Sequence, residues 1–378
     1  MKSAHLHLLI IVILAVSCSK KQGGETENPE IIIPAGQQQL SVDRLALFSI
    51  KPEIKNLQNP SWQWIFQDEI ISTIKDLDYY IAIPGKYTLT LTAKAGAVTL
   101  LKNITITVKE KEYSPLIATV FDFLQAPGQF VNTSPDYISG DTRQSMTLKA
   151  NQAIAGKTDG LLNLGGYGGY VVFGFDHLVM NKKESADFKV YGNAFENYAE
   201  PGIVQVSIDA NANGLPDDDW YELAGSEYAK PATIKNYSIT YTRPEFLNDS
   251  VLWTDNQGKS GKVFRNEYHQ QTSYFPLYFS GDELTLTGTL LAPNGKHIGV
   301  SPGDSWELPA YGWGYADNQP NAANDAGLDI DWAVNSVGEK VKLIGIHFVK
   351  VYTGTNQDTG WLGEASSEIS GAIDLNLQ

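Results

Sequence analysis

The sequence predicts an all-β protein built from two modules, a small sandwich followed by a larger jelly-roll-like β-sandwich. Three observations support this. Short runs of alternating apolar and polar residues recur along the chain, as in half-buried strands. Charged residues make up only 19% of the 378 residues, while aromatic residues make up 11% and glycines number 34. No long stretch after Tyr113 has the period of an amphipathic helix.

The small module is predicted at residues 36–110. Leu89, Leu91 and Ala93 alternate with threonines, and residues 103–108 repeat this pattern before a charged run at 109–112. Pro84-Gly85 is a turn signal that leads into a strand. Trp62 and Trp64 point the same way on a strand, which predicts core anchors in preference to a ligand platform.

Trp62-Gln63-Trp64 followed by Pro84-Gly85-Lys86-Tyr87-Thr88-Leu89-Thr90-Leu91 resembles a PKD-like, immunoglobulin-type sandwich. The resemblance implies a spacer or an adhesion unit.

The large module is predicted at residues 113–378. Strand-like runs separated by Gly, Asn, Asp and Pro clusters predict a two-sheet sandwich with long loops. These runs are residues 170–175, 188–191, 203–208, 284–290 and 341–352, with a closing strand at 369–375.

The N-terminus predicts export. Lys2 precedes a short apolar run at residues 8–16, which is typical of a signal peptide at residues 1–17. Leu14-Ala15-Val16-Ser17-Cys18 resembles a bacterial lipobox, with Ala15 where a leucine is usual, and implies lipidation of Cys18. Residues 18–35 are predicted to be a flexible tether. The alternative is an ordinary signal peptide with an incidental cysteine.

Composition excludes several functions. The formal net charge of −15 argues against a nucleic-acid partner, because phosphate binding needs clustered Lys and Arg. A single cysteine excludes a disulfide scaffold and a thiolate metal cluster. The sequence contains no GxSxG or HExxH motif, so nucleophilic and zinc-dependent hydrolysis have no support.

Residues 209–219 predict a structural calcium site. Oxygen-bearing side chains at alternate positions and a glycine at position six match the start of a calcium loop, although Trp220 stands where a bidentate Glu is expected. The predicted ligands are Asp209, Asn211, Asn213, the carbonyl of Leu215, Asp217 and Asp218. A hairpin turn without metal is the alternative.

Aromatic residues separated by glycines predict a stacking platform for a sugar or a flat macrocycle. The candidate ligand-binding residues are Tyr311, Trp313, Tyr315, Asp317, Asn318 and Trp361, with Tyr167 and Tyr170 projecting outward from a second Gly-rich segment. Alternatively, these rings plug the open end of the sandwich.

Asp329 and Asp331 lie two residues apart and give a second, enzymatic hypothesis. Paired carboxylates can perform acid–base chemistry on a glycan. The favoured interpretation is that they cap a loop and accept hydrogen bonds from backbone amides.

Further segments resemble the PKD-containing cell-surface lipoproteins of Bacteroidetes. They are residues 165–170, 174–177, 191–195 and 200–202, the acidic loop, and residues 311–315, 348–352 and 360–364. The resemblance implies a non-catalytic lipoprotein of the outer membrane, displayed on the cell surface, that captures a ligand for an uptake transporter. Cobalamin is the first expected ligand. A glycan-binding or carbohydrate-active protein, or an adhesion protein without a small ligand, are the alternatives.

Overall fold

The computed structural model describes residues 28–299 and 305–377. The chain divides into two compact units. Among the described residues, one unit comprises those up to Leu40, Ile50–Leu77 and Tyr87–Ile106, and the other comprises Ser41–Ser49, Asp78–Lys86 and those from Thr107 onward. The boundaries expected from the sequence, 36–110 and 113–378, stay predictions.

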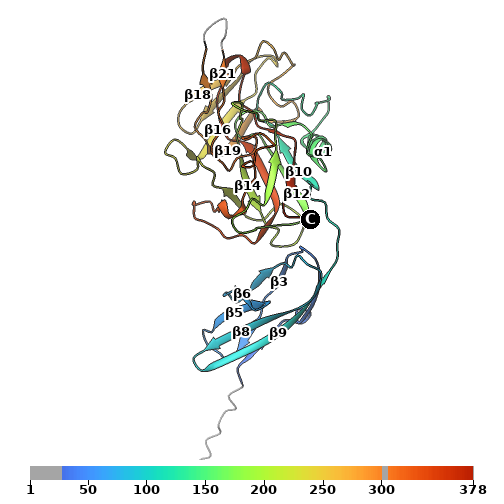
Figure 1. Ribbon diagram of the computed structural model, residues 1–378. Helices are drawn as coiled ribbons and strands as arrows, with labels where there is room; N and C mark the ends of the chain where they lie inside the picture. Colours follow the sequence, from blue (N-terminus) through green and yellow to red (C-terminus); the bar gives the residue numbers. More distant parts are fainter. Residues whose placement is uncertain (1–27, 300–304, 378) are drawn as a thin grey trace, which may run out of the picture. The chain divides into compact units, whose positions relative to one another are not determined.

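The N-terminal strands form one main five-stranded sheet (Figure 1). Its order is β2 (Gln39–Asp43), β9 (Val98–Lys109), β8 (Gly85–Ala95), β5 (Ser61–Phe66) and β6 (Glu69–Ser72). Two short pairs accompany it, β1 (Glu30–Ile32) with β4 (Glu53–Lys55), and β3 (Phe48–Ile50) with β7 (Leu77–Tyr79).

The alternation expected in β8 is confirmed. Leu89, Leu91 and Ala93 are fully buried, and β8 begins at the predicted turn residue Gly85. Trp64 is also fully buried, and its indole Nε1 donates a hydrogen bond to the carbonyl of Lys75 at 3.0 Å. Trp64 is therefore a core anchor.

The predicted tether extends too far along the chain. Residues 30–32 form β1, and Ile31 and Ile33 are 3% and 2% exposed. Alternate apolar side chains that find a partner strand gain burial, and this outweighs the flexibility expected from the polar composition. The predicted signal peptide and Cys18 lie outside the described residues.

The large unit is a two-layer β-sandwich. A six-stranded sheet has the order β10 (Thr119–Leu124), β12 (Tyr170–Met180), β23 (Gly345–Thr353), β14 (Gly202–Ser207), β15 (Trp220–Leu223) and β22 (Ala333–Val334). A four-stranded sheet has the order β18 (Ser260–Val263), β17 (Val251–Asp255), β16 (Ile234–Thr242) and β19 (Glu283–Leu290).

One hydrophobic cluster joins the two sheets. Val171, Val204 and Val349 come from the six-stranded sheet, and Ile239 and Leu286 come from the four-stranded sheet. All five side chains are buried, because alternate residues of each strand point into the shared core. The predicted mostly-β fold with a larger sandwich is confirmed, and the expected strand at 341–352 begins at Gly345.

One helix was not expected. The helix α1 (Arg143–Ile154) starts at a capping box. The Thr142 side chain accepts a hydrogen bond from the amide of Ser145, and the Ser145 hydroxyl accepts one from the amide of Thr142. Met146, Ala150 and Ile154 are fully buried at a spacing of four residues. The helix has only this narrow apolar stripe, so its sequence carries a weak helical period.

Short elements complete the large unit. They are β11 (Leu162–Asn163), β13 (Phe188–Tyr191), β20 (Lys296–His297), β21 (Trp306–Glu307), β24 (Glu368–Ile369), β25 (Gly371–Asp374), and the 3₁₀ turns η1 (Ile330–Trp332) and η2 (Gly360–Leu362). Within the described ranges, no helix has the length and apolarity needed to span a membrane.

Candidate functional site

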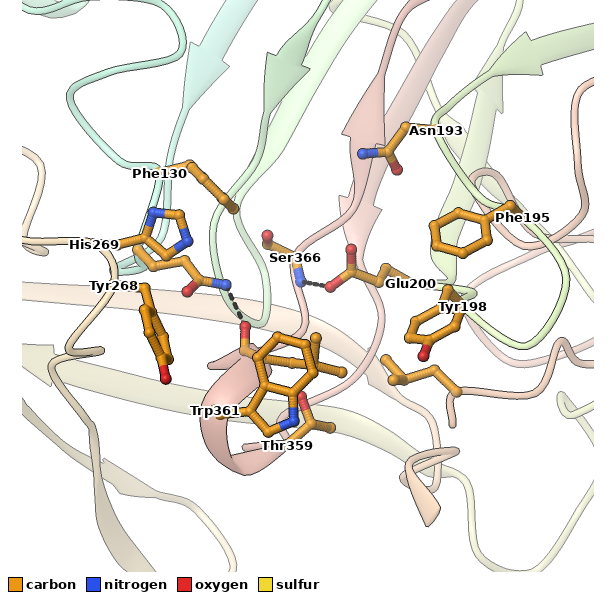
Figure 2. Close-up of a pocket in the computed structure, with 13 residues that line it drawn as sticks. Phe130, Asn193, Phe195, Tyr198, Glu200, Tyr268, His269, Thr359, Trp361 and Ser366 are labelled. Carbon is orange, nitrogen blue, oxygen red and sulfur yellow. Dashed lines mark hydrogen bonds between the residues drawn. The ribbon is translucent and has the colours of Figure 1, made fainter. Parts of the chain in front are cut away.

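The candidate site is a cleft of about 570 Å³ in the large unit (Figure 2). Loops far apart in the sequence form it, including those that follow β10, β13 and β18 and the turn η2. Its lining residues are Gln129, Phe130, Asn193, Phe195, Tyr198, Glu200, Tyr268, His269, Leu308, Thr359, Trp361, Leu362 and Ser366. This size suits a small ligand or a few units of a polymer.

Trp361 is held at the cleft by a tight glycine-flanked turn. Gly360 and Gly363 adopt φ values of +65° and +85°, a region that favours glycine. A Cβ on Gly363 would lie 2.5 Å from Oε1 of Gln129, so the close approach also requires glycine. The indole of Trp361 remains 49% exposed, and Asn266 donates to its backbone carbonyl at 2.8 Å.

Aromatic rings stand on two sides of the cleft, as Figure 2 shows. On one side, Phe130 and His269 pack edge to face with centroids 4.6 Å apart, beside Tyr268. On the other side, Phe195 and Tyr198 stack at 4.6 Å. Tyr268 and Phe195 are 67% and 59% exposed, which is unusual for such large rings and leaves part of each ring open to a ligand.

Glu200 supplies the carboxyl group of the cleft. Its Oε1 accepts a hydrogen bond from the amide of Ser366 at 2.8 Å. Behind it, Asp317 and Glu368 complete an acidic triad in which one oxygen of each residue lies within 4.8 Å of the others. This buried acidic triad can bind a metal ion.

Backbone amides hold Asp317 in place. Its Oδ1 accepts from Asn193 and Ala194, and its Oδ2 accepts from Glu368, each at 2.8 Å. Gly192 is required beside it, because a Cβ there would lie 2.1 Å from Oδ1. The carboxylate is therefore fixed with little freedom to turn.

Burial and mutual repulsion raise the pKa values of the triad. Burial, followed by repulsion from Asp317, raises the pKa of Glu200 to about 8. Burial raises the pKa of Asp317 to about 6, although the three amides oppose the shift. The pKa of Glu368 is also raised well above its ordinary value, by burial and by the two neighbouring carboxyl groups. Without a cation, the triad keeps protons at neutral pH.

Glu364 is a further buried acid near the cleft. It is 7% exposed, its Oε1 accepts from the amide of Gln129 at 2.6 Å, and its Oε2 has no hydrogen-bond partner. Burial raises its pKa to about 8 against the opposing effect of the Gln129 amide. Because Gln129 also donates to Leu362 at 2.6 Å, Glu364 supports one wall of the cleft.

The aromatic segment at 311–315 lies outside the cleft lining. Tyr315 is 6% exposed, and its hydroxyl accepts from the amide of Glu227 at 3.0 Å. The Tyr311 hydroxyl donates to the carbonyl of Ala292. Trp313 is 40% exposed and packs on Trp332 with centroids 4.5 Å apart.

The remaining predicted ligand contacts have separate positions. Asn318 is buried and makes two hydrogen bonds to the backbone of Tyr311. Asp317 belongs to the triad behind the cleft, and Trp361 lines the cleft itself. The structure therefore brings Trp361 and Asp317 to one region and leaves Tyr311, Trp313 and Tyr315 in another.

The expectation that Tyr167 projects outward is wrong. Its side chain is fully buried, 5.0 Å from the ring of Tyr237 and 6.4 Å from that of Tyr352. The reason is close backbone packing, since a Cβ on the neighbouring Gly165 would lie 1.9 Å from the carbonyl oxygen of Ala126. Tyr170 is partly exposed, and its hydroxyl donates to Oδ2 of Asp122 at 2.8 Å.

The acidic loop at 209–219 is closed by its own hydrogen bonds. Asp209 accepts from the amides of Asn213 and Gly214, and the side chains of Asn211 and Asn213 donate to Asp217. Asp218 accepts from the amide of Ala210, and Leu215 is exposed. These bonds describe an Asx-rich turn, and calcium in this loop stays a prediction.

Asp329 and Asp331 are arranged as a cap. Asp329 caps η1 and accepts from the amide of Asp331 at 2.8 Å, while Asp331 accepts from the Asn181 side chain at 3.0 Å. The favoured interpretation is confirmed for Asp329, which caps a turn and accepts from a backbone amide, whereas Asp331 accepts from a side-chain amide.

Several cleft residues were not predicted from the sequence. Phe130, Phe195, Tyr198, Tyr268 and His269 lie in loops without a shared motif. The only sequence signal was their type, since large aromatic residues in Asn- and Gly-rich loops are poor candidates for a core.

Comparison with known proteins identifies the N-terminal module. Residues 45–95 match the PKD-like domain family. No curated protein matches the chain. Similarity to solved structures includes the PKD domain of human KIAA0319, at 17% identity over 25% of this chain and 94% of that chain, with a TM-score of 0.19.

Two further solved structures resemble the chain over 93% of its length and 99% of theirs, both at 11% identity. One is a carbohydrate-binding module of the β-sandwich superfamily, with a TM-score of 0.19. The other is the Bacteroides ovatus surface glycan-binding protein SGBP-B of a mixed-linkage glucan utilization locus, in complex with a heptasaccharide, with a TM-score of 0.21. At such TM-scores, the likeness carries no argument about function.

Proposed function

We propose that the protein is a non-catalytic binding protein that captures a neutral glycan in the 570 Å³ cleft. The observation that carries this proposal is the pairing of exposed aromatic rings on two sides with hydrogen-bonding groups between them. Sugar rings present apolar C–H faces that stack on aromatic side chains, and hydroxyl groups that need directional partners. Trp361, Tyr268 and Phe195 supply the faces.

The polar groups of the cleft suit hydroxyl recognition. Asn193 is exposed and offers both a donor and an acceptor. Glu200 can accept hydrogen bonds from hydroxyl groups, and without a cation in the triad it also keeps a proton at neutral pH and can donate, because its pKa is raised to about 8. The described lining contains no Lys or Arg. A neutral ligand therefore fits better than an anionic one.

Capture fits the cleft better than hydrolysis. Most glycosidases place two carboxyl groups across the scissile bond, one protonated and one ionised. Among the described lining residues, Glu200 is the single carboxyl group, and Asp317 and Glu368 lie buried behind it. No second carboxylate faces Glu200 across the cleft in this part of the chain.

We also propose a cellular location for the protein, based on its N-terminal sequence. A signal peptide at 1–17 would direct export and be removed, and a lipid on Cys18 would hold the mature protein at the outer membrane, with the cell surface as the proposed side and an uptake transporter as the proposed partner. Labelling with a fatty-acid analogue tests this: wild type should incorporate the label and Cys18→Ala should not.

Calorimetry tests capture. The purified protein is titrated with neutral oligosaccharides, including β-glucan, xylan and mannan fragments, and with cyanocobalamin. We expect heat from at least one glycan and no release of shortened products. Heat from cyanocobalamin alone would assign the cleft to a corrinoid, and product release would make the protein an enzyme.

We also propose that the acidic triad holds calcium. Glu368 is 5% exposed, and its Oε2 has no hydrogen-bond partner although the other oxygen accepts from Ser366 at 3.2 Å and from Asn163. An unpartnered buried carboxylate oxygen beside two further carboxyl groups is the donor set of a hard cation. The loop at 209–219 is the other candidate for a calcium site, and the variants Glu368→Gln and Asp209→Asn separate the two.

A further inference from the structure

A second cavity, of about 520 Å³, lies on the six-stranded sheet of the large unit. Asp122, Val172, Lys350 and Gln205 are register partners on β10, β12, β23 and β14, so they form a row across four neighbouring strands. All four residues line the cavity. The residues that alternate with them, such as Val171 and Val349, point into the core.

Aromatic side chains and the acidic loop border this row. Tyr170 and Phe121 line the cavity from the β12 and β10 side, and Trp220 lines it at the start of β15. Leu215, which is 51% exposed, and Pro216 belong to the acidic loop and line it as well. The cavity therefore combines apolar faces with a polar row.

Both carboxylates of the cavity already have donors. Asp122 accepts two hydrogen bonds from Arg143, at 2.9 and 2.6 Å, and one from the Tyr170 hydroxyl at 2.8 Å. Asp217 accepts from the side-chain amides of Asn211 and Asn213 at 2.9–3.2 Å. Neither carboxylate forms an ion pair with Lys350.

Lys350 is the cationic side chain that lines this cavity. Its Nζ lies 4.5 Å from the Tyr170 ring centroid and 5.9 Å from that of Tyr352. Within residues 28–299 and 305–377 it has no salt bridge and no hydrogen bond. Burial lowers its pKa, opposed by Asp122. A half-buried ammonium group without an anion is stabilised by any carboxylate that reaches it.

We infer that this cavity binds a ring that carries a carboxylate, and that the ring is an acidic sugar such as a uronic acid. The carboxylate pairs with Lys350, a C–H face of the ring lies on Tyr170 or Trp220, and Gln205 bonds to a hydroxyl group. The site is independent of the cleft that contains Trp361, because the two share no lining residue. The protein thereby has one site for neutral and one for acidic glycan units.

Calorimetry with a galacturonate trimer, a galactose trimer and 4-hydroxybenzoate tests this inference. We expect the acidic trimer to bind, with affinity at least tenfold lower in Lys350→Met and largely retained in Lys350→Arg. Lys262→Met is the matched control, since Lys262 also lies over a ring, that of Phe264 at 4.7 Å, but outside this cavity. It should bind like wild type.

The outcomes separate the two sites. Trp361→Ala should retain binding of the acidic trimer even if the proposed capture in the cleft fails. Binding of 4-hydroxybenzoate without the trimer would overturn the sugar assignment. Absence of binding by both acids, or equal affinities of Lys350→Met and wild type, would overturn the site itself. Thermal melting of each variant shows whether it is folded.

Discussion

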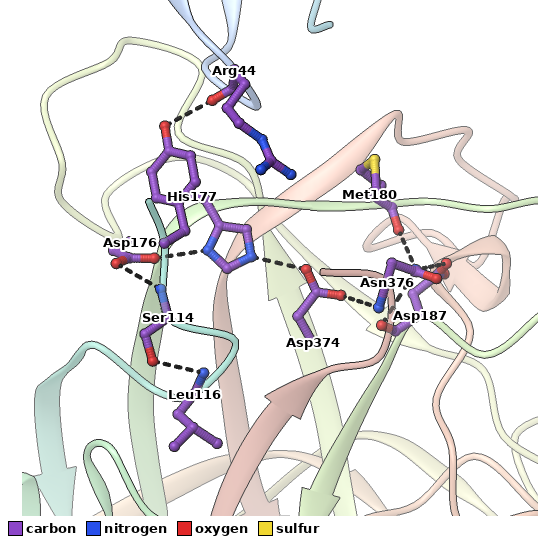
Figure 3. Close-up of polar contacts among 10 residues, drawn as sticks. Arg44, Ser114, Leu116, Asp176, His177, Met180, Asp187, Asp374 and Asn376 are labelled. Atoms are coloured by element: carbon purple, nitrogen blue, oxygen red, sulfur yellow. Dashed lines mark hydrogen bonds and ion pairs between the residues drawn. The ribbon is translucent and has the colours of Figure 1, made fainter. Parts of the chain in front are cut away.

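His177 and Asp374 form a fully enclosed contact, with Nε2 of the ring 2.8 Å from Oδ2 of the carboxylate and both side chains at 0% exposure (Figure 3). The other ring nitrogen, Nδ1, lies 2.8 Å from Asp176, whose side chain is 40% exposed. Asp374 also accepts from the amide of Asn376 at 2.6 Å. Because carboxylates occupy both nitrogens, the ring has no free nitrogen for catalysis. Its role is to fix β25 against β12.

Removal of the ring should therefore destabilise the large unit. In His177→Phe, Asp374 is left buried beside an apolar ring, and we expect a loss of about 3–5 kcal/mol in the free energy of unfolding. Urea unfolding, monitored by tryptophan fluorescence, measures this loss in the free energy of unfolding. Asp176→Asn is the control at the exposed end of the same contact and should cost less than about 1 kcal/mol. Equal losses in both variants would contradict the argument.

Trp361 should carry much of the affinity of the cleft and little of the stability. Trp361→Ala removes a half-exposed indole, so we expect at least tenfold weaker glycan binding, about 1.4 kcal/mol, with a small change in melting temperature. Trp313→Ala is matched in type and exposure but lies outside the cleft, and its affinity should equal that of wild type. Calorimetry measures the glycan affinity of both variants. If Trp313→Ala alone weakens binding, the site lies at residues 311–315.

The pKa of Glu364 predicts a loss of stability with rising pH. Its ordinary value is 4.5 and its folded value is about 8, so the folded state binds more protons than the unfolded state between these limits. Stability should fall as the pH rises through this window and level off above it. Glu364→Gln keeps the shape without the charge, so its urea midpoint should decline less between pH 5 and pH 8.5. A decline as steep as that of wild type would exclude Glu364 as a cause.

Strands were predictable where one face is buried. In β8, apolar and polar residues alternate because Leu89, Leu91 and Ala93 point into a core and the intervening threonines do not. The pattern of apolar residues did not predict the helix α1, because its buried face consists of Met146, Ala150 and Ile154 alone. A stripe of one residue per turn gives a weak signal, and tertiary contacts with β10 complete the helix.

The site was less predictable than the fold because it depends on contacts between distant loops. Trp361 was recognisable from its glycine-flanked segment. The partners that complete its cleft, such as Phe130 and Tyr198, lie more than 150 residues away in the sequence. The position of Tyr167 was not predictable for a related reason. A Gly-rich segment is compatible both with an exposed ring and with close backbone packing, and contacts with neighbouring strands determine that the Tyr167 ring is buried.

The acidic triad should bind calcium, and more strongly at higher pH. Because the pKa values of Glu200 and Asp317 are raised to about 8 and 6, a cation at neutral pH must displace protons, and it competes better when fewer protons are bound. We expect 5 mM CaCl₂ to raise the melting temperature relative to EDTA, with a larger rise at pH 8 than at pH 6. A ligand at a hundredfold excess over Kd stabilises by about 2.7 kcal/mol.

Two variants separate the triad from the loop. Glu368→Gln keeps the volume but removes a charged ligand, and it should abolish the calcium-dependent rise. Asp209→Asn is the matched change in the loop and should leave that rise intact. If Asp209→Asn abolishes the rise and Glu368→Gln does not, the cation belongs to the loop at 209–219. If calcium changes the melting temperature of none of the proteins, the buried carboxyl groups keep their protons instead of binding a metal.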